Sequence, residues 1–304
     1  MSTLITGGAG YIGSHAAREM LERGRDVVVY DNLVKGHRAA VKDCPLIVGD
    51  IFDQKLLRET IEKYHVENVI HFAAFSLVGE SMVDPQKYYY NNLAGTLSLL
   101  TAMKDTGVKH IVFSSTAATY GEPEIVPITE DCPQHPTNVY GRTKLMMEKM
   151  IADFDMAYGM KFIALRYFNV AGAHRSGEIG EDHSPESHLL PIIFQVLNGK
   201  REKLMVFGDD YPTTDGSCIR DYIHVTDLAD AHILALDRLG ETNTSDAFNL
   251  GNGSGFSVLE VIRCVERVTG KKVPYEIAPR RAGDPAVLIA GSDKAHATLG
   301  WNPR

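Results

Sequence analysis

The sequence predicts an α/β fold of the Rossmann type, in which helices cover both faces of a doubly wound parallel sheet. Short apolar runs alternate with longer helical segments through the first half of the chain, which is typical of such a sheet. The first apolar run leads directly into a glycine-rich turn. With 304 residues, 44% hydrophobic and 23% charged, the chain is long enough for a buried core and for a smaller C-terminal α/β substrate-binding domain.

The elements of the first half follow from these runs. Buried parallel strands are apolar throughout because both of their faces are covered, and we expect them at residues 4–6, 27–30, 46–48, 69–72, 111–114 and 162–167. Helices are expected at residues 11–23, 54–64 and 138–158, with an irregular one around 86–104.

The pattern loosens after about Phe168. Residues 173–186 are rich in Gly, His, Ser and acidic side chains and predict a loop. Helices are expected at 189–197, 225–236 and 257–268, the last two capped by Thr226 and Ser257. We therefore expect a nucleotide-binding domain at 1–168, to which the chain returns around 220–250. Residues 169–304 are expected to form mainly the substrate-binding domain.

Composition excludes several classes of function. A formal charge of −8 and the lack of a basic run disfavour a nucleic-acid partner. No apolar stretch reaches membrane-spanning length, and the first residues run straight into a strand, which leaves no room for a signal peptide. The four cysteines are scattered and are expected to be reduced thiols. These features predict a soluble cytoplasmic protein without a membrane partner.

A glycine-rich turn, Thr6-Gly7-Gly8-Ala9-Gly10-Tyr11-Ile12-Gly13, follows the first strand and opens the first helix. The glycines at 7, 10 and 13 permit a tight turn, close approach to a pyrophosphate and close helix–strand packing. The N-terminus of the helix then faces the phosphates. This arrangement predicts a dinucleotide site.

Polar and small residues at three further strand ends complete that site. Asp31 ends the second strand, and its carboxylate can bind a ribose diol and repel a 2′-phosphate, which favours NAD over NADP. Asp50 and Ile51 follow the third strand and can meet the adenine edge, although Asp50 can equally cap the next helix. Phe72-Ala73-Ala74 closes the fourth strand and suits close approach of a cofactor, although a packed strand end looks the same.

Tyr140 and Lys144 are four residues apart, so both lie on one face of a helix, one turn apart. A phenol that works as a base near neutral pH needs its pKa lowered by roughly 2–3 units, or about 3–4 kcal/mol. An ammonium at roughly 4 Å supplies about that much at an effective dielectric near 20. Together with the glycine-rich turn, the pair becomes a strong signal of a tyrosine that works as a base beside a bound nucleotide.

The order of these motifs resembles the extended short-chain dehydrogenase/reductase family, and within it the UDP-sugar 4-epimerases. The resemblance covers essentially all 304 residues. It rests on the strings His71-Phe72-Ala73-Ala74, Ser114-Ser115-Thr116, Arg166-Tyr167-Phe168-Asn169, Phe207-Gly208-Asp209-Asp210-Tyr211, Arg220-Asp221-Tyr222-Ile223-His224 and Arg280-Arg281-Ala282-Gly283-Asp284.

The resemblance implies NAD-dependent interconversion of UDP-glucose and UDP-galactose with a cofactor that stays bound. Tyr140 would take the proton of the sugar 4′-hydroxyl while C4 gives its hydride to the nicotinamide. The 4-keto sugar would rotate and be reduced again on its other face. Thr116 would hydrogen-bond the same hydroxyl, and Lys144 would lower the pKa of the tyrosine and hold the nicotinamide ribose.

The resemblance also implies two sets of binding residues. Those for the cofactor are Gly7, Gly10, Tyr11, Ile12, Gly13, Asp31, Asn32, Asp50, Ile51, Phe72, Ala73, Ala74, Asn91, Tyr140, Lys144 and Tyr167. Those for the UDP-sugar are Thr116, Tyr140, Asn169, His188, Leu189, Phe207, Arg220, Arg281 and Asp284. Arginines suit this role because a planar guanidinium meets diphosphate oxygens with two bonds.

Several positions depart from the family pattern. Ser76 stands where many epimerases have a lysine, and His188 stands where asparagine is frequent. Leu288 occupies a position where a tyrosine or cysteine gates the sugar pocket, so 4-epimerisation of UDP-N-acetylglucosamine stays open as a sole or additional activity. The chain stops at Arg304, where relatives continue into a further helix, which suggests a truncated chain.

Another UDP-sugar-modifying member of the family, such as a decarboxylase, stays open as an alternative, whereas two other activities on the same scaffold are disfavoured. A 4,6-dehydratase carries Asp-Glu directly after the threonine, whereas Ala117 and Ala118 follow Thr116 here. A non-catalytic dinucleotide sensor typically loses the tyrosine or the lysine, and both are present.

The sequence also bears on metals and on assembly. The histidines of the 173–188 loop lack ligand spacing such as His-x-x-x-His, so we attribute them to a polar loop and expect no metal. Apolar stripes run along residues 93–103 and 139–154 and are expected to pack on the sheet. The equivalent helices of the family also build a dimer interface, which predicts a homodimer.

Overall fold

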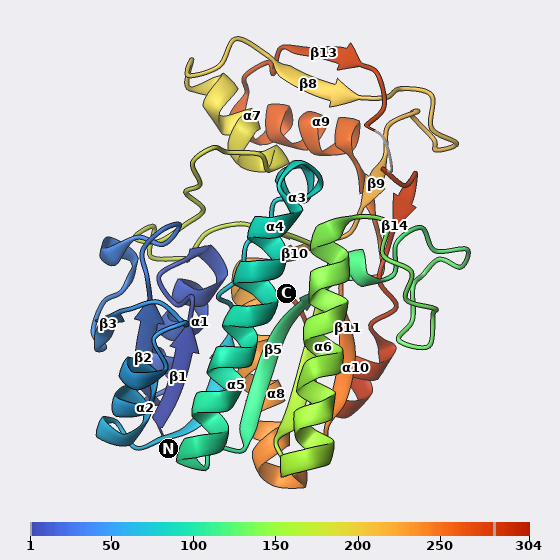
Figure 1. Cartoon of the computed structure of the whole chain (residues 1–304). Coiled ribbons are helices and arrows are strands. Elements are labelled where there is room, and N and C mark those ends of the chain that lie inside the picture. Colours follow the sequence, from blue (N-terminus) through green and yellow to red (C-terminus); the bar gives the residue numbers. More distant parts are fainter. Residues whose placement is uncertain (1, 282–283) are drawn as a thin grey trace.

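The computed structural model describes residues 2–281 and 284–304. A seven-stranded parallel sheet has the strand order β11-β6-β5-β4-β1-β2-β3, and a smaller α/β layer lies above its carboxyl edge (Figure 1). From β1 the strands follow one another outward to β3, and from β4 they follow one another in the opposite direction to β11. The strand order therefore reverses between β1 and β4, where Thr6 pairs with His71. Such a reversal opens a crevice beyond the strand ends, which is where ligands of this fold bind.

The strands of this sheet are β1 (Ser2–Thr6), β2 (Asp26–Asp31), β3 (Leu46–Val48), β4 (Val66–His71), β5 (His110–Thr116), β6 (Lys161–Tyr167) and β11 (Asp246–Leu250). The short strands are β7 (Asn169–Ala171), β8 (Leu204–Phe207), β9 (Ile219–Arg220), β10 (Tyr222–His224), β12 (Phe256–Ser257), β13 (Tyr275–Ala278) and β14 (Val287–Leu288). The helices are α1 (Tyr11–Glu22), α2 (Gln54–Lys63), α3 (Val78–Val83), α4 (Pro85–Tyr88), α5 (Gly95–Thr106), α6 (Val139–Tyr158), α7 (Leu189–Leu197), α8 (Val225–Thr242), α9 (Val258–Thr269) and α10 (Asp293–Leu299).

Each face of the large sheet has its own apolar core. Helices α1, α8 and α10 cover one face, with Met20, Leu239 and Trp301 fully buried. Helices α2, α5 and α6 cover the other, where Leu57 and Met147 are fully buried. Full burial of an aliphatic side chain contributes about 1.5–3 kcal/mol, so these two layers fix the sheet. The doubly wound fold predicted from the sequence is confirmed.

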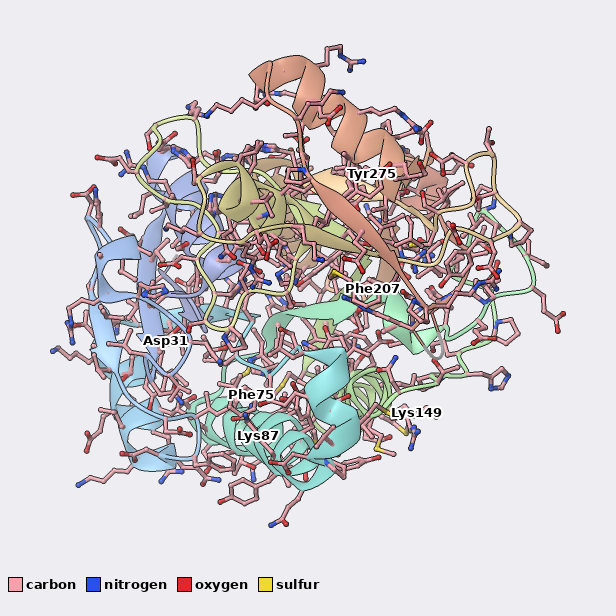
Figure 2. All side chains as sticks on the ribbon, turned by 90° about the horizontal axis from the view of Figure 1, so that it is seen from above. Asp31, Phe75, Lys87, Lys149, Phe207 and Tyr275 are labelled. Carbon is pink, nitrogen blue, oxygen red and sulfur yellow. The ribbon has the colours of Figure 1, made fainter. Side chains whose placement is uncertain are left out.

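The smaller layer consists of the parallel pair β8–β13 with helices α7 and α9, around a core that includes Ile193, Val206 and Ile262. In Figure 2, Phe207 on β8 and Tyr275 on β13 are labelled on this layer, and Asp31 on β2 is labelled to their left. Among the described residues, no helix has the length and apolar character needed to cross a membrane.

The irregular segment around residues 86–104 is a chain of short elements rather than one helix. Helix α4 continues into a π-helical stretch, Tyr89–Ala94, and then into α5. Within this stretch the Asn92 amide donates to the Phe75 carbonyl (3.1 Å) and to the Thr143 hydroxyl (3.0 Å). The widened turn thus ties the segment to α6, in agreement with the frequent occurrence of π-helical turns at functional sites.

Helix ends show where local signals succeed and fail. Ser257 caps α9 as predicted, in a reciprocal capping box with Glu260. The prediction of Thr226 as a cap was wrong, because the cap is His224, two positions earlier, whose imidazole accepts the Thr226 N–H. Helix α8 also continues to Thr242 rather than ending at Leu236, since Leu239 extends its buried stripe by one turn.

Candidate functional site

A cavity of about 490 Å³ opens at the carboxyl ends of β1 and β4, and residues from the segments 181–188 and 284–288 line its other side. The cofactor residues predicted from the sequence line it, except Asp50: Gly7, Gly10, Tyr11, Ile12, Gly13, Asp31, Asn32, Ile51, Phe72, Ala73, Ala74, Asn91, Tyr140, Lys144 and Tyr167. Segments far apart in the sequence therefore meet at the position that the fold reserves for ligands.

The glycine-rich turn has the geometry that a dinucleotide requires. Gly7 has a φ of +73°, and a Cβ there would lie 2.6 Å from the Ala73 nitrogen. A Cβ on Gly13 would lie 2.3 Å from the Gly7 carbonyl oxygen. No larger residue fits at either place. Gly10 precedes α1 and has no side chain to cap it, which leaves the first backbone N–H groups available to a phosphate.

Asp31 lies at the end of β2 and supports the same turn. One carboxylate oxygen accepts the Ala9 N–H (2.9 Å) and the other accepts the Leu33 N–H (2.8 Å). Asp50 does not line the cavity among the described residues; it accepts a hydrogen bond from the Asn32 amide (2.9 Å). Nor does it cap α2, because Asp53 accepts the Leu56 N–H in that role.

Tyr140, Lys144 and Thr116 meet inside the cavity. Asn138 caps α6 and starts the helix so that Tyr140 and Lys144 follow one turn apart. The Lys144 Nζ donates to the Ser114 carbonyl (2.7 Å) and lies 6.0 Å from the centre of the Tyr140 ring. Thr116 is the last residue of β5, the strand that also carries Ser114. Helix and strand together fix all three side chains.

Burial has the largest effect on the pKa values of Tyr140 and Lys144. It raises the pKa of Tyr140 to about 12, although a hydrogen bond with the Thr116 hydroxyl works in the opposite direction. Burial likewise lowers the pKa of Lys144 to about 7, against the attraction of Glu148. The pKa of the phenol therefore lies above its ordinary value in this structure. Additional positive charge close to Tyr140 would be needed to make it a base near neutral pH.

Glu148 and Arg166 form a buried ion pair that was not predicted from the sequence. Glu148 lies one turn after Lys144 on α6, and its carboxylate accepts from Arg166 and from the Ser115 hydroxyl. The Tyr120 hydroxyl donates to Asn249 on β11 (2.7 Å) and accepts from Arg166 (2.8 Å). The four-residue spacing from Lys144 was the available signal for Glu148.

The predicted substrate residues divide into two groups. Thr116, Tyr140, Asn169, His188, Arg220 and Asp284 line the cavity, together with Ser76 and Leu288. The Arg220 guanidinium donates to Asp284 (2.7 Å) and to the Pro285 carbonyl (2.9 Å). Leu189, Phe207 and Arg281 are not part of the lining formed by the described residues; the Arg281 guanidinium stacks on the Phe207 ring at 3.9 Å.

Further residues that carry no local signal also line the cavity, among them Val34, Lys35, Phe75, Leu77, Glu80, Glu181, His183 and Pro185. Phe75 is held by the Lys87 ammonium, 4.5 Å from its ring centre (Figure 2). The 173–188 loop has neither helix nor strand, as predicted, and brings Glu181, His183, Glu186 and His188 together. The histidines lack a ligand spacing in the sequence, and only the fold of the loop brings them together with the two glutamates.

Comparisons with known proteins agree with this geometry. Residues 3–251 match the model of the NAD dependent epimerase/dehydratase family. A UDP-glucose 4-epimerase of Halalkalibacterium halodurans is 58% identical, with 100% of this chain and 91% of that protein covered. Another, from Lacticaseibacillus casei, is 56% identical, with 100% and 92% covered.

Solved structures show the same likeness in three dimensions. The Brucella ovis UDP-glucose 4-epimerase in complex with NAD has a TM-score of 0.98 at 50% identity, with 100% of this chain and 93% of that chain covered. The Bifidobacterium longum enzyme in complex with NAD⁺ and UDP has a TM-score of 0.96 at 41% identity, with 100% and 94% covered. The chain described here therefore belongs to the NAD dependent epimerase/dehydratase family.

Proposed function

We propose that this protein interconverts UDP-glucose and UDP-galactose by inverting C4 of the sugar, with NAD as its cofactor. The observation that carries the proposal is the Tyr140–Lys144 pair, buried with Thr116 in a cavity beside the glycine-rich turn. Eight relatives at 46–58% identity, matched over at least 99% of this chain, bear the name of that activity.

The residues of the chain divide the acid–base work. The Tyr140 oxygen takes the proton of the sugar 4′-hydroxyl and later returns it to the C4 oxygen. The Thr116 hydroxyl orients the reacting oxygen, and the Lys144 ammonium stabilises the phenolate. When bound, NAD accepts the C4 hydride and gives it back. The 4-keto sugar rotates within the cavity between the two proton transfers.

The turn at Gly7–Gly13 would hold the pyrophosphate of the cofactor, and Asp31 its adenosine ribose. The close approach of Gly7 to Ala73 fits this role, because only a residue without a side chain leaves that space open. Asn32, Ile51, Phe72 and Asn91 would line the remainder of the cofactor site, and Asp50 would act through Asn32.

Arg220 and Asp284 would bind the uridine diphosphate, with Asn169 and His188 on either side of it. A bidentate arginine suits a diphosphate. Leu189, Phe207 and Arg281 would complete this site by movement of the smaller layer toward the ligand. Leu288 lines the cavity and would set the room available to substituents of the sugar.

Proton NMR of UDP-galactose incubated with the purified protein tests the function. We expect UDP-glucose to appear and to approach the same ratio when the reaction starts from either sugar. No NAD should need to be added if the cofactor is retained. An unchanged spectrum after NAD is supplied would refute the proposal, and Tyr140→Phe is the matched negative control.

We also propose that residues 1–168, with the return at 220–250, bind the cofactor, whereas residues 169–304 mainly bind the UDP-sugar. The entry of β11 into the large sheet and the pairing of β8 with β13 in the smaller layer support this division. Domain-wise chemical-shift or hydrogen-exchange changes on adding NAD and UDP separately would test it.

A homodimer through α5 and α6 is part of the proposal. Leu100, Met103 and Met147 face the sheet, whereas Leu97 and Met146 remain exposed on the same helices, which lie side by side in Figure 1. Light scattering coupled to size exclusion should give twice the chain mass, and a monomer would refute it. A cytoplasmic location is proposed as well, because Cys44, Cys132, Cys218 and Cys264 are free thiols.

A further inference from the structure

Four side chains with metal-ligand chemistry converge in the loop that precedes α7. Glu181, His183, Glu186 and His188 lie within eight residues of one another, and one ligand atom from each falls within 4.8 Å of all the others. The proposed epimerase chemistry uses neither glutamate and does not use His183. This mixed set of two imidazoles and two carboxylates differs from the exposed acidic clusters that are common on protein surfaces.

The distances within the cluster suit a single small cation. The Nδ1 atom of His183 lies 3.3 Å from Glu181 and 3.8 Å from Glu186. The Nδ1 atom of His188 lies 2.7 Å and 3.2 Å from the same two carboxylates. Ligands bound at roughly 2.1 Å to a tetrahedral ion are about 3.4 Å apart, a value inside this range.

One buried polar atom of the cluster, the Nδ1 of His183, lacks a hydrogen-bond partner among the described residues. The side chains of Glu181 and Glu186 are only 7% and 3% exposed. Two nearby cationic side chains bind main-chain oxygens instead: Lys35 donates to the Ser184 carbonyl (2.8 Å) and Arg201 to that of Glu186 (3.2 Å). Buried carboxylates require a compensating charge.

We propose that Glu181, His183, Glu186 and His188 bind one divalent cation of the zinc class. Two neutral imidazoles and two carboxylates then balance the charge of the ion, and the nitrogen ligands favour zinc over magnesium. This assignment replaces the expectation of no metal, which rested on sequence spacing alone.

The ion fastens the loop over the nucleotide-binding turn. The ring of His183 lies edge-on to Tyr11 at 6.2 Å, and His37 contacts the Asp182 carbonyl (3.1 Å) from the segment after β2. His188 is also the N-cap residue that directly precedes α7. Closing the eight-residue loop around a cation thus connects the cofactor side of the cavity with the smaller layer.

Isothermal titration of chelator-stripped protein with Zn²⁺ and with Mg²⁺ tests the site directly. We expect one Zn²⁺ per chain, with binding at least about 100-fold tighter than that of Mg²⁺. Glu181→Gln and His183→Gln should each weaken Zn²⁺ binding at least tenfold, the range seen when a ligand environment is disturbed. Glu178→Gln is the matched control, because it removes the same charge from an exposed position of the same loop.

Several results would overturn the proposal. The proposal is wrong if the wild-type protein does not bind Zn²⁺, whatever the variants show. Binding that survives both substitutions would also overturn it, since it would place the ion elsewhere, for example at Glu19, Glu22 and His174. Circular dichroism without zinc should show that the variants are folded. If they are not, anomalous scattering at the zinc edge in wild-type crystals decides, with a peak expected between the four side chains. These measurements do not depend on the epimerase activity.

Discussion

Arg166 clamps the carboxylate of Glu148 with two hydrogen bonds, from Nε at 3.1 Å and from Nη2 at 2.7 Å. Both side chains are at least nine-tenths buried. Because Glu148 follows Lys144 by one turn of α6 and Arg166 belongs to β6, this ion pair joins the helix that carries the base to an inner strand of the sheet. The negative charge of Glu148 also favours the protonated form of Lys144.

Glu148→Leu should therefore strongly destabilise the fold. It leaves the Arg166 guanidinium buried without a counter-charge, and breaking a buried pair in this way costs about 3–5 kcal/mol. The double variant Glu148→Leu/Arg166→Met should lose much less, because no charge is stranded. Urea unfolding of the three proteins measures both effects. Equal losses in the single and double variants would contradict the argument.

Lys144 should make stability depend on pH. Its pKa is about 7 in the folded protein, well below its ordinary value of 10.5. Between these values the unfolded chain binds a proton that the folded chain does not, so the free energy of unfolding rises with pH. Below about pH 7 both states are protonated and the contribution is flat.

Relative to Lys144→Met, the wild-type protein should gain up to about 1.4 kcal/mol per pH unit between pH 7 and 10. Urea unfolding of both proteins without added nucleotide, at pH 7, 8 and 9, measures the difference. Parallel curves for the two proteins would show that the folded-state pKa of Lys144 is not depressed.

Tyr140→Phe should reduce turnover by roughly 10²–10⁴-fold, the usual contribution of a positioned acid–base group. The phenyl ring keeps the shape of the site, so retained NAD should be unchanged by absorbance and mass spectrometry. Tyr158→Phe removes an equivalent hydroxyl from an exposed position of the same helix and should leave turnover intact. Full activity of the Tyr140 variant would exclude the phenol as the base.

Asp31→Asn should weaken NAD binding about tenfold or more, because a hydrogen bond to a charged group contributes roughly 1.5–3 kcal/mol. The ratio of the affinities for NAD and NADP should fall at the same time, since the repulsion of a 2′-phosphate is lost. Titration calorimetry with both cofactors tests this. Asp43→Asn is a suitable control, because asparagine tolerates the φ of +62° found at that position.

Local spacing predicted the parts of the site that lie on one element or at one strand end. The Gly7–Gly13 turn, Asp31 and the Tyr140–Lys144 pair all line the cavity because period and strand order decide where such residues lie. The Glu148–Arg166 pair was not predicted, since it joins separate elements. The cluster at Glu181–His188 and the π-helical turn before α5 were missed for a related reason: irregular backbone follows no period.

The position of β11 has a consequence for synthesis on the ribosome. Strand β6 pairs with β11, and α8 covers one face of the sheet, although both elements follow β6 by a long stretch of chain. A nascent chain ending after β6 exposes an unpaired strand edge and a bare apolar face. The roughly 80 residues still to be translated take on the order of 4–16 s at cellular rates. During that interval the first half of the protein is a substrate for chaperones rather than a finished domain.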